Sequence, residues 1–146
     1  MFSFRVLVYG SKAYQDMVSL RDRVLRKPLG LSFSREYLAK EKDDILIGSF
    51  TTTQPEQLVG CCILTPVDVR TVQLRQMAVS PDYQQQGIGS EIVKYAEALA
   101  TEAGYSTLMM HARATAIHFY TKLGYKTIGA TFEEVGIPHV EMQKIL

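Results

Sequence analysis

The junction at residues 77–90 constrains the fold most, because it joins an expected strand directly to an expected amphipathic helix. It reads Met77-Ala78-Val79-Ser80-Pro81-Asp82-Tyr83-Gln84-Gln85-Gln86-Gly87-Ile88-Gly89-Ser90. Its two glycines let backbone N–H groups approach a ligand closely. The first turn of the helix adds unpaired N–H donors and the positive end of the helix dipole. The junction therefore predicts a site for a phosphate or pyrophosphate.

Three other interpretations of a Gly-x-Gly at such a junction need to be compared. A dinucleotide-binding fingerprint expects a third glycine at position 92, where this sequence has Ile92. A phosphate-loop NTPase needs Gly-Lys-Ser or Gly-Lys-Thr, and neither is present. A plain structural turn remains open on local sequence alone.

The order of the expected elements predicts an α/β domain with a mixed, predominantly antiparallel sheet. Apolar alternation and β-branched runs predict strands at 2–9, 45–53, 58–66, 72–79, 107–111, 125–128 and 140–145. Apolar residues at helical spacing predict helices at 14–25, 33–40, 88–102 and 116–123. Thr115 is the expected N-cap of the last helix, and Gly124 its end. Without a repeat or linker, residues 1–146 form one expected domain.

Composition and charge exclude several classes of protein. A hydrophobic fraction of 47% and a charged fraction of 21% are ordinary for a globular chain. The net charge of +1 gives no electrostatic reason to expect nucleic acid or a membrane surface as partner. No apolar run approaches the ~20 residues that span a bilayer, and the amino terminus does not look like a signal peptide. We therefore expect a cytoplasmic protein.

The cysteines and histidines do not predict a metal site. Cys61 and Cys62 are adjacent in an expected strand, so their side chains should point to opposite faces of the sheet. None of the three histidines has metal-ligand spacing with them. We therefore expect no metal, and reduced cysteines fit a reducing compartment.

Three segments together resemble the GNAT superfamily of N-acetyltransferases. The run 84–89, Gln-Gln-Gln-Gly-Ile-Gly, is similar to the family's Gln/Arg-x-x-Gly-x-Gly/Ala signature. Met77-Ala78-Val79-x-Pro81 resembles the strand that leads into that loop. The run 116–125, Ala-Ile-His-Phe-Tyr-Thr-Lys-Leu-Gly-Tyr, resembles the family's late helix and the strand after it. The resemblance spans about residues 58–146 and implies the acyl-CoA N-acyltransferase fold, with a splayed central strand pair flanked by helices.

The resemblance also implies how acetyl-CoA is bound. The pantetheine arm would enter the splay between the strand ending at Val79 and the strand at 107–111. Backbone amides from Gln85 to Ser90 would hold the pyrophosphate, and the Gln84 side chain would fix the loop. The residues implied to bind acetyl-CoA are Met77, Ala78, Val79, Gln84, Gln85, Gln86, Gly87, Ile88, Gly89, Ser90, Arg113 and Phe119.

Arg113 departs from the family's pattern, because many members have asparagine three residues before the alanine matched by Ala116. Its cationic fork could reach a CoA phosphate or an acidic substrate. A solvated arginine in a loop is the alternative.

Tyr120 is the catalytic residue that the resemblance implies, as the general acid that protonates the departing thiolate. A phenol with a pKa of ~10 can donate to a thiolate whose acid has a pKa of ~8.5. The alternative is a core tyrosine on the stripe formed by Ala116, Phe119 and Leu123.

The general base is not identified by the sequence. Some family members carry a carboxylate on the strand before the loop, whereas residues 72–76 contain no Asp or Glu. The remaining candidates are a water chain, Glu133, Glu134 and His139, and each residue also fits a solvated loop position. The stretch 132–139 is expected as a loop that either lines the acceptor pocket or shapes a hairpin.

The predicted function is transfer of the acetyl group of acetyl-CoA to a primary amine of an unidentified small-molecule or peptide acceptor, by direct attack in a ternary complex. A non-catalytic acyl-CoA-binding or sensory domain is the alternative, and a nucleotide-binding α/β module is a third reading. Arg26, Lys27 and Arg35 could attract a negatively charged acceptor, and solvated basic side chains are the alternative. Homodimers are frequent in the family, so a homodimer is one possible assembly.

Overall fold

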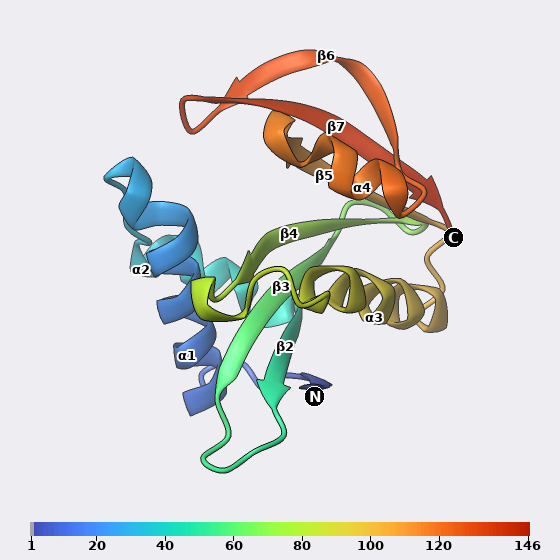
Figure 1. Cartoon of the computed structure of the whole chain (residues 1–146). Coiled ribbons are helices and arrows are strands. Elements are labelled where there is room, and N and C mark those ends of the chain that lie inside the picture. The colour runs from blue at the N-terminus through green and yellow to red at the C-terminus, as the bar shows by residue number, and fades with distance from the viewer. Residues whose placement is uncertain (1) are drawn as a thin grey trace.

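The structure is a computed structural model that describes residues 2–146 and contains one seven-stranded sheet (Figure 1). The strands lie in the order β1-β2-β3-β4-β5-β7-β6. Every neighbouring pair is antiparallel except β4 and β5, which are parallel. This confirms the expected mixed, mostly antiparallel sheet. The bounds are β1 Phe2–Val6, β2 Ile45–Thr51, β3 Leu58–Pro66, β4 Thr71–Val79, β5 Thr107–Arg113, β6 Lys126–Glu134 and β7 Ile137–Ile145.

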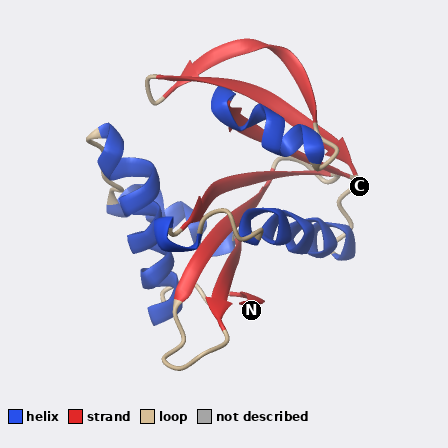
Figure 2. Cartoon of the chain, viewed as in Figure 1, coloured by secondary structure: helices blue, strands red, loops and turns tan. Residues whose placement is uncertain are grey.

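Helices flank the sheet on both faces (Figure 2). The α-helices are α1 Lys12–Arg21, α2 Arg35–Ala39, α3 Ile88–Glu102 and α4 Ile117–Lys122. A π-helical turn at Asp22–Arg26 and a 3-10 turn at Lys27–Leu29 continue α1. Further 3-10 turns lie at Lys40–Asp43, Pro81–Tyr83 and Ala114–Ala116. In Figure 1, α1 and α2 lie on one side of β2–β4 and α3 lies on the other. Across residues 2–146, no helix is both long enough and apolar enough to cross a membrane.

Two apolar cores lie on the two faces of the sheet, and the adjacent cysteines divide between them. Cys61 packs with Met17 and Leu20 of α1, whereas Cys62 packs with Ile92 of α3. Both cysteines are free and fully buried. Burial raises the pKa of Cys61 to about 12 and that of Cys62 well above its ordinary value. The expectation that neighbouring side chains point to opposite faces is confirmed, and both thiols are held in their protonated, unreactive form.

The central strands β4 and β5 pair for only part of their length. Their parallel ladder runs from Thr71 opposite Thr107 to Leu74 opposite Met110. β4 continues to Val79 and β5 to Arg113 without further pairing between them. The register of β4 against β3 also shifts between Cys61 and Ile63, and Gln76 takes a left-handed φ of 56° at this bulge. A bulge bends its strand, so it bends β4 at the place where the two strands diverge.

Three local expectations were wrong in whole or in part. Thr115 is not an N-cap: residues 114–116 form a 3-10 turn, and α4 follows an N-cap at Ala116 that makes no side-chain hydrogen bond. The stretch 132–139 forms a hairpin, as one alternative expected, but its loop is only the turn at 135–136, because β6 extends to Glu134 and β7 begins at Ile137. β6 is exposed along its whole length, so it lacks the buried alternation by which a strand is recognised. The first strand ends at Val6 rather than Tyr9.

Candidate active site

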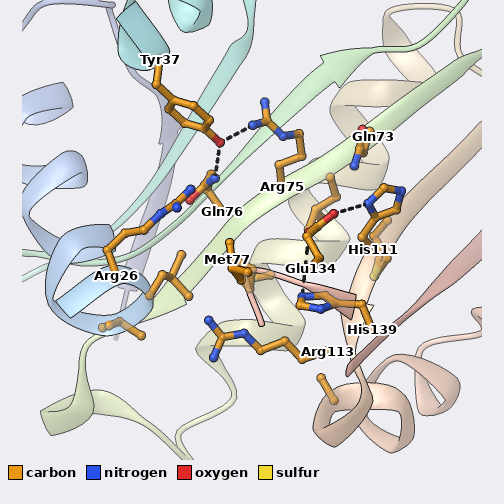
Figure 3. Close-up of a pocket in the computed structure, with 16 residues that line it drawn as sticks. Arg26, Tyr37, Gln73, Arg75, Gln76, Met77, His111, Arg113, Glu134 and His139 are labelled. Carbon is orange, nitrogen blue, oxygen red and sulfur yellow. Dashed lines mark hydrogen bonds and ion pairs between the residues drawn. The ribbon is translucent and has the colours of Figure 1, made fainter. Parts of the chain in front are cut away.

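A cavity of about 600 Å³ opens where β4 and β5 diverge (Figure 3). Its walls come from four parts of the chain: the region from the π-helical turn to α2, strand β4, the end of β5 with the turn after it, and the β6–β7 hairpin. The lining residues are Val24, Leu25, Arg26, Tyr37, Gln73, Leu74, Arg75, Gln76, Met77, Met110, His111, Arg113, Ala116, Glu134, Val135 and His139. The predicted cofactor residues Met77 and Arg113 are therefore in this cavity, and Tyr120 is not among its lining residues.

The loop from Gln84 to Gly87 connects β4 to the N-terminus of α3. The Gln84 side-chain amide donates to the Val79 carbonyl over 3.1 Å, which ties the loop back to the strand. Gly87 is the N-cap of α3 and has a φ of 80°, a conformation that glycine adopts without strain. A Cβ atom built on Gly87 would meet no heavy atom within 4 Å, so the positive φ, rather than crowding, requires glycine.

The N–H groups of the first turn of α3 have no side-chain cap. They therefore remain available to an anion at the positive end of a helix that runs from Ile88 to Glu102. The predicted pyrophosphate residues Gln85–Ser90 lie together at this helix end. The first-turn N–H groups and the positive end of the helix dipole both face the junction before α3, so the junction fits a pyrophosphate group.

Phe119 places α4 beside the start of α3. A Cβ atom on Gly89 would lie 3.2 Å from the Phe119 ring, so a larger residue would require the ring to shift by a few tenths of an ångström. The Phe119 ring in turn meets Tyr120 edge to face, with ring centroids 4.9 Å apart. The predicted cofactor residues Gly89 and Phe119 are therefore in contact, and the Tyr120 ring packs against the Phe119 ring.

Tyr120 is buried on the inner side of α4, with 6% of its surface exposed. Burial raises the pKa of its phenol above the ordinary value, and nearby Cys62 contributes a smaller increase. Its ring also packs edge to face on Tyr125. Within residues 2–146, its hydroxyl has no hydrogen-bond partner, since its contacts are with rings and apolar groups. Tyr120 thus belongs to the core stripe, with a protonated hydroxyl that is not engaged elsewhere.

A carboxylate and two imidazoles form one wall of the cavity (Figure 3). Glu134 Oε1 lies 2.9 Å from His111 Nδ1, and Glu134 Oε2 lies 3.9 Å from His139 Nε2. His139 was expected in a solvated loop, but it lies in β7 with 4% of its surface exposed. Of the three acid–base candidates, Glu134 and His139 line the cavity, whereas Glu133 does not. His111, which sequence reasoning placed only in a strand, joins them.

The tautomer of His139 follows from its backbone contact. Its Nδ1 lies 2.9 Å from the Ile137 carbonyl oxygen, which can only accept a hydrogen bond. Nδ1 therefore carries the proton, and in the neutral ring Nε2 carries a lone pair on the side of Glu134. This is the arrangement that a proton acceptor needs.

The wall formed by α2, β4 and the π-helical turn carries N–H and O–H donors. The Tyr37 hydroxyl accepts hydrogen bonds from Arg75 Nη2 at 2.5 Å and from Gln76 Nε2 at 2.9 Å. Arg26 lies 4.5 Å above the Phe33 ring and 5.4 Å above the Tyr37 ring. Arg26 lines the cavity, whereas Lys27 and Arg35 do not. Tyr37, Arg75 and Gln76 were missed because no motif marks them.

Among the described residues, no three His, Cys, Asp or Glu side chains are grouped so that they could hold a metal ion.

Comparison with known proteins agrees with this geometry. The family model described as an acetyltransferase (GNAT) domain matches residues 25–146. An uncharacterised N-acetyltransferase of Bacillus subtilis, YitI, is 29% identical over 141 residues, which cover 90% of this chain and 91% of the relative. A second Bacillus subtilis protein, YyaT, is 36% identical over 74 residues. That match spans about half the length of the relative.

Solved structures share the fold over nearly the whole chain. Escherichia coli ElaA has a TM-score of 0.80 at 18% identity, covering 99% of both chains. A GNAT family acetyltransferase from Elizabethkingia anophelis with acetyl-CoA bound has a TM-score of 0.75 at 19% identity, covering 99% of this chain and 98% of that one. The match over residues 25–146 carries the assignment, and the structures show the same fold. The chain belongs to the GNAT superfamily of N-acetyltransferases.

Proposed function

We propose that this protein transfers the acetyl group of acetyl-CoA to a primary amine by direct attack in a ternary complex. The observation that carries the proposal is the cavity opened by the divergence of β4 and β5. Met77 lines this cavity, and the same strand leads within a few residues into the loop before α3. The cavity thus contains candidate acid–base groups for amine acylation, and the strand that lines it leads to the uncapped N-terminus of α3.

Acetyl-CoA would be held by backbone groups. The edge of β4 from residue 75 to Val79 that faces β5 has no strand partner in the described chain, so its polar groups are free to pair with the pantetheine arm. The uncapped amides between Gln85 and Ser90 would hold the pyrophosphate. Acetyl-CoA in the Elizabethkingia structure and coenzyme A in an aminoglycoside 6'-N-acetyltransferase structure support this cosubstrate.

Tyr120 would supply the proton for the departing sulfur. Attack of the amine on the thioester carbonyl breaks the carbon–sulfur bond, and the sulfur leaves as a thiolate that must be protonated. The raised pKa of Tyr120 keeps its phenol protonated at neutral pH. Tyr120 lies four residues after cavity-lining Ala116, the N-cap of α4, so it follows the cavity wall by about one helical turn.

His139 would accept the proton that the attacking nitrogen loses. An ammonium has no lone pair, so it must lose a proton before it can form the new C–N bond. His139 Nε2 is the unprotonated nitrogen in the neutral ring, and the Glu134 carboxylate beside it would attract the incoming ammonium. The absence of a carboxylate on β4 from residue 72 to 76 therefore does not leave the site without a base.

Calorimetric titration with acetyl-CoA, CoA, ATP and NAD, followed by a screen of amines for turnover, tests the proposal. We expect acetyl-CoA and CoA to bind at one site, ATP and NAD to bind far more weakly, and CoA to be released when an acceptor amine is present. Binding of acetyl-CoA without turnover of any amine would favour the alternative, a non-catalytic acyl-CoA-binding or sensory domain. Absence of CoA binding by folded protein would overturn both.

Three expectations stay predictions: a single domain over residues 1–146, a cytoplasmic location and a homodimer.

A further inference from the structure

The donor wall of the cavity has chemistry that acetyl transfer itself does not use. Arg26 and Arg75 of this wall line the cavity, and neither forms an ion pair with a carboxylate of the described chain. Arg113 lines the cavity from the end of β5, opposite His139. Neighbouring Arg21, in contrast, is fully buried and pairs with Glu41 over 2.7 Å. The arginines of this region are therefore paired where they are structural and unpaired where they face the cavity.

Tyr37 extends this wall with a hydroxyl hydrogen. Its oxygen accepts from Arg75 and, with the amide oriented as in this structure, from Gln76. A phenol carries only one O–H hydrogen, and both of these neighbours present N–H donors to it. The Tyr37 hydrogen is therefore directed at neither neighbour, and Tyr37 lines the cavity. It is a donor available to a ligand.

Arg26 is held in place by aromatic rings rather than by an anion. Its guanidinium lies over the rings of Phe33 and Tyr37, at 4.5 and 5.4 Å from the ring centroids. These cation–π contacts use the charge of the guanidinium and take up no hydrogen bond to an acceptor of the described chain. Its N–H groups therefore remain for a ligand, in the fork that matches a carboxylate. The same ring thus positions Arg26 and supplies the Tyr37 hydroxyl.

The two walls have opposite character. Figure 3 shows Arg26, Tyr37 and Arg75 on one side of the cavity, and Glu134, His111 and His139 on the other. One side presents cationic and neutral donors. The other presents the Glu134 carboxylate and a His139 nitrogen that carries a lone pair in the neutral ring, with Arg113 beside them at the end of β5. A ligand that matches both sides carries an anion at one end and an ammonium at the other.

We propose that the acceptor is an amine that also carries a carboxylate, bound by Arg26 and the Tyr37 hydroxyl, with its amino group toward Glu134 and His139. Arg75 acts as a positioning residue, because its two hydrogen bonds go to the hydroxyls of Tyr37 and Thr65. This substrate class rests on the proposed acetyl transfer.

Matched pairs of amines that differ only in the carboxylate test the inference. Lysine and cadaverine, ornithine and putrescine, and phenylalanine and phenethylamine are such pairs, and amino acids paired with their amides widen the panel. With acetyl-CoA saturating, we expect kcat/KM to be roughly tenfold or more higher for the carboxylate member of the pairs that are turned over. The difference should shrink as salt rises, because a charge contact is screened.

Arg26→Gln, compared with Arg23→Gln, assigns the preference to this wall. Arg23 lies on the same π-helical turn, but it is exposed and does not line the cavity. We expect Arg26→Gln to reduce the ratio of the two kcat/KM values roughly tenfold through a higher KM for the carboxylate member. Arg23→Gln should keep the wild-type ratio. Tyr37→Phe should reduce the ratio in the same direction, and the unfolding temperature of each variant shows that it is folded.

The outcomes separate this inference from the proposed function. If the folded protein does not bind acetyl-CoA, both the proposed function and this inference are wrong. Turnover of amines with equal or lower kcat/KM for the carboxylate members overturns only the inference. Turnover of amines that lack a carboxylate, with no turnover of any carboxylate-bearing amine in the panel, also overturns only the inference, and so does an unchanged ratio in folded Arg26→Gln. Acetyl-CoA binding with no turnover of any amine overturns the proposed transfer and this inference with it.

Discussion

At the scale of single residues, the environment of Tyr120 decides which protonation state of its phenol is available. Its surroundings are the Phe119 and Tyr125 rings and the buried Cys62, none of which stabilises a phenolate. Removing the hydroxyl from such a site leaves packing nearly intact, because the ring fills the same space. A change at this atom therefore reports on chemistry more than on folding.

Tyr120→Phe should lower kcat about 100-fold, the usual scale for loss of a general acid, with less than about a twofold change in acetyl-CoA affinity. Steady-state kinetics with a good acceptor and calorimetry with acetyl-CoA measure the two effects. Tyr105→Phe is a matched control, since Tyr105 packs half-buried against the same core. An unchanged kcat, where chemistry limits turnover, would remove Tyr120 from the proton-donor role.

His139→Gln should lower kcat/KM about 100-fold at neutral pH, because the ammonium of the acceptor loses its proton acceptor. The deficit should narrow as pH rises toward the pKa of the acceptor amine, since more of the amine is then already neutral. A pH profile of kcat/KM for wild type and variant measures this. His118→Gln is the control, because His118 is exposed on α4 outside the cavity. A deficit that stays constant with pH would indicate a structural role for His139 instead.

At the scale of elements, the N-terminus of α3 offers a pair of matched glycines. Gly87 before the helix and Gly104 after it both have positive φ, 80° and 97°, and a Cβ atom would meet nothing within 4 Å of either. Alanine at either position should cost about 1–2 kcal/mol of folding free energy. Only Gly87→Ala should also weaken acetyl-CoA binding, by roughly tenfold, because it displaces the first-turn amides. Denaturation and calorimetry distinguish the two, and equal affinities in both variants would contradict a binding role for this helix end.

Most elements could be predicted from the sequence, because a buried face gives apolar residues at regular spacing. The stripe of α3 and the strand before it show this, because Ile88, Ile92 and Ala96 all face the core. The β6–β7 hairpin could not be delimited, because β6 is exposed on both faces and its residues follow no apolar alternation. Similarly, the N-cap expected at Thr115 gave way to a 3-10 turn that local sequence did not indicate.

The loop before α3 could be located from the sequence, whereas most residues of the cavity wall could not, for a physical reason. The loop before α3 is continuous in sequence, so its spacing carries the information. The cavity instead combines Tyr37, Arg75 and His139 from three elements that are distant in sequence, and only the packing of the sheet brings them together. A buried histidine on a late strand, preceded by Pro138, gives no spacing signal of its own.

At the scale of the whole molecule, buried acidic groups should make the fold sensitive to alkali. Burial raises the pKa of Cys61 from 9.0 to about 12, and that of Cys62 well above its ordinary value. Above pH 9 these thiols ionise in the unfolded chain but stay protonated in the folded one, so stability is complete below pH 9 and is lost as pH rises toward 12. Each such group should lower the free energy of unfolding by ~1.4 kcal/mol per pH unit over this range.

Denaturant titrations between pH 7 and 11 measure this slope. Cys61→Ala should reduce the slope, whatever its effect on stability at pH 7, because one titrating group is removed. A free energy of unfolding that stays level from pH 8 to 11 would show that the thiols ionise equally in both states.

The short ladder between β4 and β5 also bears on stiffness. A sheet is stiff where its strands are hydrogen-bonded and bends where they are not, so bending should concentrate along the seam beyond Leu74 and Met110. A molecule lying in that seam and bonded to the free edge of β4 would act as a brace between the two halves of the sheet. In the proposed reaction the bound cosubstrate would then supply part of the rigidity that aligns the acceptor, and release of the product would return the sheet to its softer form.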